Sequence, residues 1–286
     1  MCYYNGQKVT RAEYIRLKHL EKLVSNYDFL KVPVHEAFDY GLNAVLKREP
    51  SVEDFDIVQM EWGIVPPLPD RQAIWNFRHN YTDTNGIFHR GTDTMNAKAE
   101  NLFINEKGRA SMHRESALKR RCLVLSTGFY EFRHIHHRNK RTGERLKTPT
   151  TYPYRIQVRD REYFYLAGIW APWYAKDGSN EYAEMFSVVT TEANELMAKV
   201  HNKKKRMPTI LNEDLAYEWL FGNIGHERIS EIAKSQYPSE EMEAYTIQRK
   251  FEECLDPTSP CHYPDCPELG DDDGSLMAGS LQPTLF

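Results

Sequence analysis

The second residue of the chain is a cysteine, and its thiol becomes part of the N-terminal residue once the initiator Met1 is removed. Methionine aminopeptidases remove an initiator methionine when the next side chain is small, as that of Cys2 is. The mature chain would carry an α-amine and a thiol on one residue, with ordinary pKa values of about 8 and 8.5. Such a 1,2-aminothiol condenses with aldehydes, because the amine forms a Schiff base and the thiolate closes on the imine carbon to give a thiazolidine. We therefore predict that Cys2 is the nucleophile of a covalent reaction.

Six short segments of the sequence carry a family pattern when they are read together. The segments are Met1-Cys2, 62–66 (WGIVP), 95–100 (MNAKAE), 121–132 (RCLVLSTGFYEF), 167–170 (AGIW) and 190–208, which contains TTEAN, HN and RMP. In this order and spacing the chain resembles the SRAP family, the SOS-response-associated peptidase-like proteins that process abasic sites in DNA. The resemblance covers residues 2 to about 250, and six motifs in register are far more specific than any one of them.

The resemblance implies an enzyme that covalently traps abasic sites in single-stranded DNA. An abasic deoxyribose opens to an aldehyde at C1′, which is the electrophile that an N-terminal aminothiol captures. By motif, Cys2 is the nucleophile, Asn96 positions it or the sugar, Glu131 is a general acid/base, and His201 assists proton transfer. The crosslink would shield the site from strand-breaking β-elimination. The family is also described as peptidase, hydrolase and lyase.

The reaction requires these residue types on chemical grounds as well. Sugar-ring opening moves a proton from the C1′ hydroxyl to the ring oxygen, imine formation releases water, and thiazolidine closure needs a base for the thiol. One carboxyl group and one imidazole with pKa values near the working pH can carry these protons. Outside the family context, Glu131 would be interpreted as an exposed strand residue and His201 as a core or loop residue.

Two other functions stay open at this stage. The first is a cysteine peptidase in which Cys2 attacks a peptide carbonyl, His201 acts as the base, and removal of Met1 is autocatalytic. The second is a non-catalytic protein that binds single-stranded DNA through basic clusters and aromatic side chains. Incubation with an oligonucleotide that contains one abasic site separates the three functions, because only crosslinking shifts a band on a denaturing gel.

The positive charge of the chain is concentrated in short basic clusters. The net charge is −4, but eight carboxylates after Lys250 leave residues 1–250 with about +4. Clusters at 119–121, 138–147 and 203–206 suit a phosphate backbone, which dominates affinity for nucleic acids. We predict single-stranded DNA as the partner, with phosphate contacts from Lys98, Arg114, Arg121 and Arg206, and with base stacking by Trp62 or by an aromatic near Trp75 and Phe77.

The sequence departs from the family pattern where DNA would pass. Tyr3-Tyr4 stands where Gly-Arg is usual, and Asn101 stands where threonine is usual. Lys98 replaces an arginine, which keeps the charge but loses the bidentate fork that grips phosphate oxygens. Three lysines, 203–205, are inserted before Arg206. These departures concern the DNA path and leave the four catalytic positions unchanged.

Composition is that of an ordinary globular protein, and we predict a monomer of the cytoplasm that is associated with the nucleoid. The chain is 41% hydrophobic and 27% charged, and no stretch reaches the ~20 apolar residues that a membrane span needs. Its five cysteines are odd in number and unevenly spread, so a disulfide framework is not expected. Cys254, Cys261-His262 and Cys266 have a spacing that matches no zinc module, so we predict no metal and no cofactor.

The expected elements do not alternate in a βαβ rhythm. Strands are predicted at 55–65, on both sides of 126–128, and at 152–158, 162–170, 184–190 and 242–248. Helices are predicted at 11–25, at 191–200 with Thr191 as N-cap, at 213–221 and at 225–234. This order predicts an α+β fold of one domain, 2–250, with mostly antiparallel sheets in a barrel-like core and peripheral helices.

Residues 251–286 differ from the rest in composition. They are acidic and rich in Pro, Gly, Asp and Ser, so we predict a disordered tail that cannot bury enough apolar surface to order itself. The last five residues, 282–286, have the pattern Q-x-x-L-F, which resembles the peptides by which bacterial DNA polymerases and repair proteins dock on the replicative sliding clamp. Leu285 and Phe286 would fill an apolar pocket while Gln282 makes the orienting hydrogen bonds.

Overall fold

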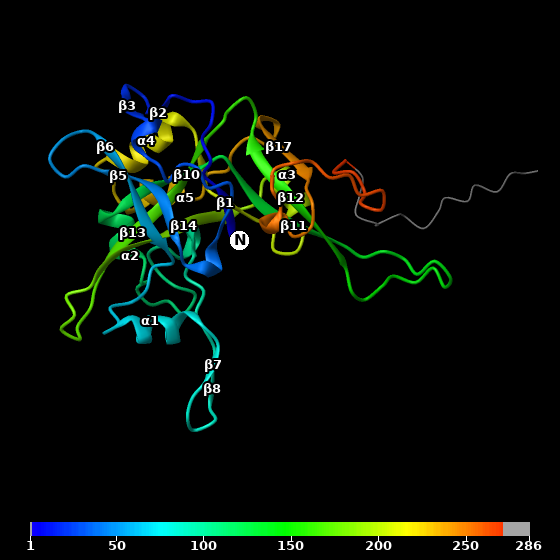
Figure 1. Cartoon of the computed structure of the whole chain (residues 1–286), viewed down its shortest axis with the longest axis horizontal. Coiled ribbons are helices and arrows are strands. Elements are labelled where there is room, and N and C mark those ends of the chain that lie inside the picture. Colours follow the sequence, from blue (N-terminus) through cyan, green and yellow to red (C-terminus); the bar gives the residue numbers. More distant parts are fainter. Residues whose placement is uncertain (1, 271–286) are drawn as a thin grey trace, which may run out of the picture.

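The structure is a computed structural model that describes residues 2–270 of the chain (Figure 1). Its centre is a closed barrel in which five strands pair in the order β14-β6-β5-β10-β13 and β13 pairs back with β14. These strands are β5 (Leu42–Arg48), β6 (Phe55–Trp62), β10 (Arg121–Ser126), β13 (Phe164–Tyr174) and β14 (Tyr182–Glu192). Within this ring the β14–β6 pair is parallel and the other pairs are antiparallel. Closure removes the exposed sheet edges that an open sheet would present.

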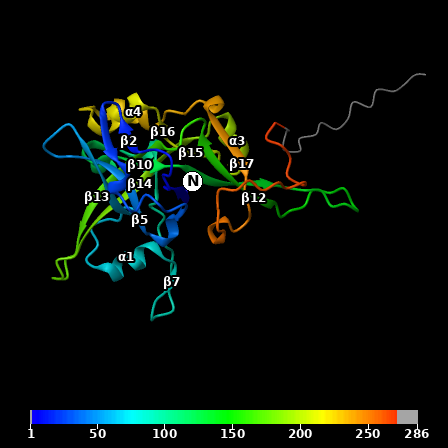
Figure 2. The same cartoon turned by 45° about the horizontal axis from the view of Figure 1, so that its top comes forward.

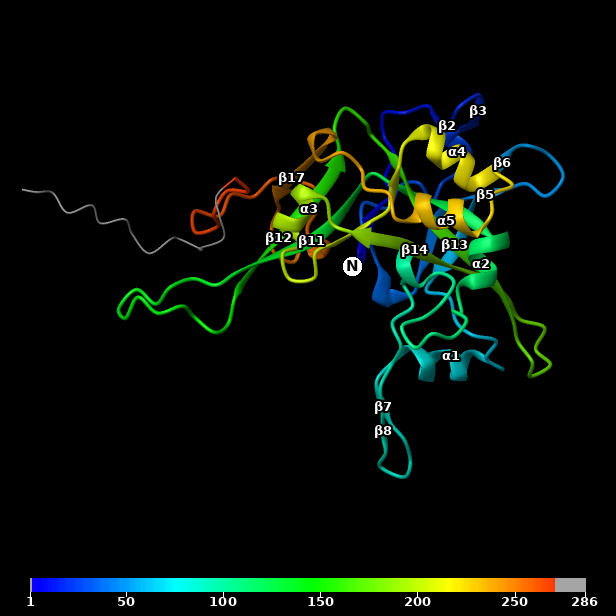
Figure 3. The ribbon, with the colours of Figure 1, turned by 180° about the vertical axis from the view of Figure 1, so that it is seen from behind.

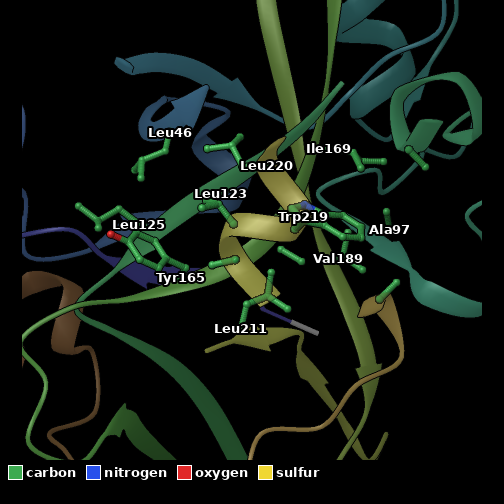
Figure 4. Packing of buried hydrophobic residues seen from close by; sticks show 14 of the residues in the cluster. Leu46, Ala97, Leu123, Leu125, Tyr165, Ile169, Val189, Leu211, Trp219 and Leu220 are labelled. Atoms are coloured by element: carbon green, nitrogen blue, oxygen red, sulfur yellow. The ribbon is translucent and has the colours of Figure 1, made fainter. Parts of the chain in front are cut away.

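Both faces of the barrel strand β10 are buried, which explains its continuous apolar run. Successive side chains of a strand point to opposite faces, and β10 sends Leu123 and Leu125 into one apolar cluster and Cys122 and Val124 into another. The first cluster surrounds Trp219, whose Nε1 donates to the main-chain oxygens of Cys122 and Gly168 at 3.0 Å each (Figure 4). The second cluster contains Cys2.

A second sheet of five strands lies beside the barrel (Figure 2). Its order is β17 (Met242–Thr246), β12 (Thr150–Val158), β11 (Gly128–Ile135), β1 (Tyr4–Gly6) and β4 (His35–Glu36). The chain passes from the barrel into this sheet between β10 and β11, at Gly128. Its φ of 149° and the Arg155 guanidinium, 2.8 Å from where a Cβ would stand, leave room for glycine alone.

Short strands and helices complete the domain. β9 (Asn96–Lys98) and β15 (Arg206–Pro208) pair with β14, and β16 (Ile210–Leu211) pairs with β13. The α-helices are α1 (Arg71–Arg78), α2 (Arg114–Lys119), α3 (Glu195–Val200), α4 (Glu213–Phe221) and α5 (His226–Ala233). The 3₁₀ helices are η1 (Val24–Asn26), η2 (Ala37–Asp39), η3 (Ala99–Asn101), η4 (Ser239–Glu241) and η5 (Phe251–Glu253). Among residues 2–270, no helix has both the length and the apolar character needed to cross a membrane.

The predicted fold class is confirmed, and two local predictions within it are wrong. The expected helix at 11–25 is a hairpin of β2 (Tyr14–Leu17) and β3 (Leu20–Leu23). Its apolar residues recur at every third position because Tyr14 pairs with Leu23 and Leu17 with Leu20 across the hairpin. The helix expected to begin after Thr191 begins at Glu195 instead, because the side chain of Asn194 caps it by accepting from the Met197 amide.

The ordered chain extends twenty residues beyond the expected start of the tail. Phe251 is buried and stacks on Tyr130, with ring centroids 4.6 Å apart. Tyr263 donates to the Ile247 carbonyl at 2.9 Å, and Pro267 accepts from Arg133 at 2.5 Å. Residues 251–270 therefore belong to the packed domain, which corrects their assignment to a disordered tail. The remaining acidic residues and Gln282, Leu285 and Phe286 lie outside the described residues.

Candidate active site

The four predicted catalytic residues converge where the barrel meets the second sheet. Cys2 is fully buried just before β1, and the chain begins between these two sheets (Figures 1 and 3). The side-chain amide of Asn96 donates to the main-chain oxygen of Cys2 at 3.0 Å. Nδ1 of His201 lies 3.7 Å from Oε1 of Glu131, and both side chains are buried. Residues 2, 96, 131 and 201 thus form one buried site.

Strand register is what brings these distant residues together. Tyr4 pairs with Tyr130, which sets the start of the chain beside Glu131 on β11. Asn96 pairs with Val188 of β14. Just before β15, the C-cap of α3 places His201 beside the second sheet, where Nδ1 contacts the Arg206 carbonyl at 2.9 Å. Strand pairing therefore positions Glu131 and Asn96 and brings the start of the chain beside Glu131, while the C-cap of α3 positions His201.

Burial sets the protonation states of the site. It raises the pKa of Glu131 to about 7 and lowers that of His201 to about 4, because both charged forms lose solvation. Burial, followed by the negative charge of Glu131, also raises the pKa of the Cys2 thiol. At neutral pH, Glu131 exchanges a proton readily while His201 is a neutral imidazole. These are the properties of a carboxyl group suited to general acid/base catalysis.

The hydrogen bonds of His201 fix its tautomer. The Arg206 carbonyl can only accept, so Nδ1 of the neutral ring carries the proton and donates it. Nε2 is then the nitrogen with the lone pair. Arg206 in turn is held by both carboxylate oxygens of Glu100, at 2.6 and 3.1 Å, and by the Thr190 carbonyl at 2.6 Å. Arg206 therefore positions His201 through its main chain, and its guanidinium is already engaged with an anion.

A surface depression of about 430 Å³ leads to the site from Asn96. Its other lining residues are Lys98, Asn101, Asn105, Ala110, Ser111, Met112 and His113. Oδ1 of Asn96 is buried and accepts no hydrogen bond from any described residue. The depression therefore lies next to an acceptor that lacks a donor among the described residues.

Two of the predicted DNA contacts lie at this depression. Lys98 lines it, and its Nζ pairs with the exposed Glu106 at 2.6 Å, an ion pair that an incoming phosphate can replace. Arg114 is exposed at the first position of α2, directly after His113 of the lining. Both cations can therefore reach a phosphate next to a bound sugar.

One predicted DNA contact, Trp62, is wrong, and another, Arg121, is engaged with carbonyl groups of the protein itself. Trp62 is fully buried, stacks on Phe186 at 5.6 Å and donates to the Met95 carbonyl at 3.0 Å, so it supports the strand of Asn96 and cannot reach a base. The guanidinium of Arg121 donates hydrogen bonds to main-chain carbonyls at the ends of two helices. Its hydrogen bonds run to Ala117, Leu118, Trp219 and Gly222. Burial also lowers the pKa of Arg121 to about 10. This arginine ties α2 to α4.

A row of aromatic rings on α1 and the next hairpin was only partly visible in the sequence. Trp75 stacks on His79 with centroids 4.8 Å apart, and Tyr81 stacks on His89 at 4.7 Å. Tyr40 links the row to the apolar cluster of Cys2. The hairpin of β7 (Tyr81–Thr82) and β8 (Phe88–His89) projects away from the barrel (Figure 1). Only the density of aromatic residues between 75 and 89 signals this surface, because their spacing follows no single period.

The cysteines expected near the C-terminal end of the domain remain apart from any metal-binding arrangement. Within residues 2–270, no group of three or more His, Cys, Asp or Glu side chains could hold a metal ion. Cys254, Cys261 and Cys266 are free thiols of intermediate exposure. The Cys266 thiol instead contacts the Tyr154 hydroxyl at 3.4 Å, which fits a packing role.

The model of the family "SOS response associated peptidase (SRAP)" matches residues 23–254. The chain belongs to the SRAP family. Two relatives from Bacillus subtilis strain 168 are named abasic site processing protein YoqW and abasic site processing protein YoaM. YoqW is 27% identical over 189 residues, 66% of this chain and 68% of its own length. YoaM is 28% identical over 189 residues, 66% of this chain and 67% of its own length.

Solved structures share the SRAP fold of this chain. A protein from Bacteroides thetaiotaomicron superposes with a TM-score of 0.61 at 23% identity, over 91% of this chain and 97% of its own. A protein from Bordetella bronchiseptica superposes with a TM-score of 0.56 at 17% identity, over 86% of this chain and all of its own. The closed barrel and its flanking sheet are thus an architecture already observed by crystallography.

Proposed function

We propose that this SRAP protein crosslinks itself to abasic sites in single-stranded DNA through Cys2, after removal of Met1. The observation that carries the proposal is the anchoring of the Cys2 main chain by Asn96 in a buried site that also holds Glu131 and His201. The names of the two Bacillus relatives supply the substrate class. The crosslink would protect the abasic site from strand cleavage.

The chemistry balances with the groups of this site alone. The α-amine of Cys2 attacks the C1′ aldehyde, and the resulting carbinolamine loses water to give an imine. Glu131 in its acid form protonates the departing hydroxyl. Its carboxylate then takes the thiol proton while sulfur adds to C1′, which regenerates the Glu131 acid, and the ring nitrogen keeps the hydrogen that it carried in the protonated imine. One water is released overall, and His201 assists the proton transfers as a neutral imidazole.

The protonation states favour this reaction over peptide hydrolysis. Cysteine peptidases depend on a thiolate whose pKa is lowered by a neighbouring imidazolium. In this site burial raises the pKa of the Cys2 thiol and lowers that of His201, so the two groups are neutral together near pH 7. A protein that only binds DNA does not require a buried carboxyl group such as Glu131, whose pKa is about 7.

The deciding experiment uses an oligonucleotide with one natural abasic site and a second with a tetrahydrofuran analogue that has no aldehyde. The proposal predicts a band shifted by the mass of the protein on a denaturing gel for the first oligonucleotide only. Mass spectrometry of the digested product should place the adduct on Cys2, without Met1. Binding without any shifted band would leave a non-catalytic DNA-binding protein, and cleavage of an N-terminal peptide alone would favour the peptidase.

Base stacking on α1 gives a prediction for DNA affinity. Trp75 has 46% of its surface exposed and heads the aromatic row, so Trp75→Ala should weaken binding of single-stranded DNA by about 1–3 kcal/mol, the usual value of one stacked base. The control is Tyr174→Ala, which removes an exposed aromatic at the far end of β13. Titration of a labelled oligonucleotide measures both variants. Equal affinities for wild type and Trp75→Ala would remove α1 from the DNA path.

The motif at 282–286 predicts a second partner on sequence grounds alone. A peptide of residues 276–286 should bind a bacterial sliding clamp, and its Leu285→Ala, Phe286→Ala counterpart should not, because the two apolar side chains fill the pocket. Fluorescence anisotropy with both peptides tests this. Such docking would raise the effective concentration of the enzyme near template strands. Equal binding of both peptides, or binding of neither, would contradict it.

A further inference from the structure

A groove of about 710 Å³ lies at the base of the long loop 136–149. This loop connects β11 to β12 and extends far from the second sheet (Figure 1). The lining residues are His134, Ile135, His136, His137, Arg138, Arg145, Pro149, Asn202, Lys203 and Pro267. The lining includes three permanent cations and no carboxylate, so the groove is built for an anion.

The groove adjoins the catalytic site through two direct chain connections. Asn202 follows His201, and His134 lies three residues beyond Glu131 on β11. These two lining residues are locked together, because the His134 amide donates to Asn202 Oδ1 at 3.0 Å and Asn202 Nδ2 donates to the His134 carbonyl at 2.8 Å. The groove therefore begins within one to three residues of Glu131 and His201 along the chain.

Two cations of the groove are held opposite each other despite their mutual repulsion. Arg138 and Arg145 pair directly across the loop in an antiparallel bridge, an arrangement of like charges that costs stability. The Leu146 amide holds this register by donating to the His137 carbonyl at 2.8 Å. Lys203, from the lysine insertion, faces the same groove. Among residues 2–270, none of these three cations has a carboxylate within 4.0 Å, so a bound anion would relieve the repulsion.

We propose that this groove binds the sugar–phosphate backbone of the DNA strand on one side of the abasic site. The proposal rests on the function proposed above and adds to it a path for the flanking strand. Arg138 lies seven residues beyond Glu131, which is roughly 20 Å along an extended chain, so the flank must be several nucleotides long to reach it. The histidine and asparagine side chains add hydrogen-bond donors for phosphate and sugar oxygens.

The test measures affinity for three oligonucleotides that carry the tetrahydrofuran analogue, one with flanks of about ten nucleotides and two with either the 5′ or the 3′ flank cut to about two. The variant is Arg138→Gln, Arg145→Gln, Lys203→Gln. For the long oligonucleotide it should bind about ten-fold more weakly and lose about 2 from the log–log salt slope, since each phosphate contributes about 0.7. For one of the two shortened oligonucleotides, variant and wild type should bind alike.

The control variant removes three exposed cations that do not line the groove, Arg11→Gln, Lys31→Gln and Lys176→Gln. It should retain wild-type affinity and salt slope, and thermal melting checks that both variants fold. Equal loss on all three oligonucleotides, equal loss in the control, or no loss at all would each overturn the groove proposal. Crosslinking of a natural abasic site at saturating DNA is measured separately, so wild-type protein that binds but forms no adduct would refute the proposed function and not the groove.

Discussion

Cys2→Ala should abolish the stable adduct with abasic DNA altogether. The alanine variant retains the α-amine but has no thiol, so it can form only an imine, which hydrolyses unless it is reduced with borohydride. Cys2→Ser should behave similarly, because a hydroxyl is a poorer nucleophile for ring closure. The measurement is the yield of the shifted band on a denaturing gel, with and without borohydride.

Two controls make the Cys2 result interpretable. Affinity for the tetrahydrofuran oligonucleotide should stay close to wild type in both variants, because the thiol lies in the apolar cluster and not in the depression that leads to Asn96. Cys122→Ala removes another fully buried thiol from the same cluster and should still form the crosslink. A Cys2→Ala protein that crosslinks as efficiently as wild type would refute the mechanism.

Glu131→Gln and His201→Ala should each slow crosslinking by about 10²–10⁴-fold, the usual contribution of a positioned acid–base group. Glutamine retains the shape of Glu131 but cannot exchange the proton. Loss of the His201 ring removes the neutral imidazole that the Arg206 carbonyl holds in one tautomer. Single-turnover rates at saturating DNA measure the effect, and DNA affinity should change little. If a variant bound DNA poorly but reacted at the normal rate at saturating DNA, the acid–base role assigned to the replaced residue would be wrong.

The pH dependence of the crosslinking rate should distinguish the role of Glu131 from that of His201. Because burial raises the pKa of Glu131 to about 7, the acid form that protonates the departing hydroxyl is lost between pH 6 and 8, so the wild-type rate should show a falling inflection over this range. Glu131→Gln should lose this inflection and retain only the one set by the α-amine. His201, with its pKa lowered to about 4, should add no inflection there, so His201→Ala should keep the wild-type profile at a lower rate.

Sequence motifs were sufficient to select four residues that the structure brings close together. Cys2, Asn96, Glu131 and His201 were identified by motif and spacing, and the structure brings them into one site. Their protonation behaviour could not be predicted, because it follows from burial that only the assembled sheets create. Local runs of apolar and β-branched residues likewise predicted β6, β10, β11, β12, β13, β14 and β17, since a strand pattern is local.

Prediction from sequence failed for residue types that occur both on DNA-binding surfaces and in protein cores. An arginine or a tryptophan serves a DNA surface and a core equally well, and Arg121 and Trp62 turned out to hold helix ends and the Asn96 strand. The hairpin at 14–23 was interpreted as a helix because cross-strand pairing produced the same spacing. Residues 251–270 were predicted to be disordered because of their polar composition. Phe251 nevertheless stacks on Tyr130, and a contact between residues so distant in sequence cannot be predicted from local composition.

The complete burial of Cys2 has a consequence for how the protein is made. Residue 2 has no exposed surface in the folded domain, and the neighbouring β1 is already paired on both edges, with β11 and β4. A separate aminopeptidase needs the first residues of its substrate extended in its own cleft, and β1 cannot offer them. We infer that trimming by such an enzyme must take place on the nascent chain, before β1 enters the sheet. Under the proposed mechanism, chains that fold untrimmed could not form the crosslink, so the timing of biosynthesis would decide which molecules can react.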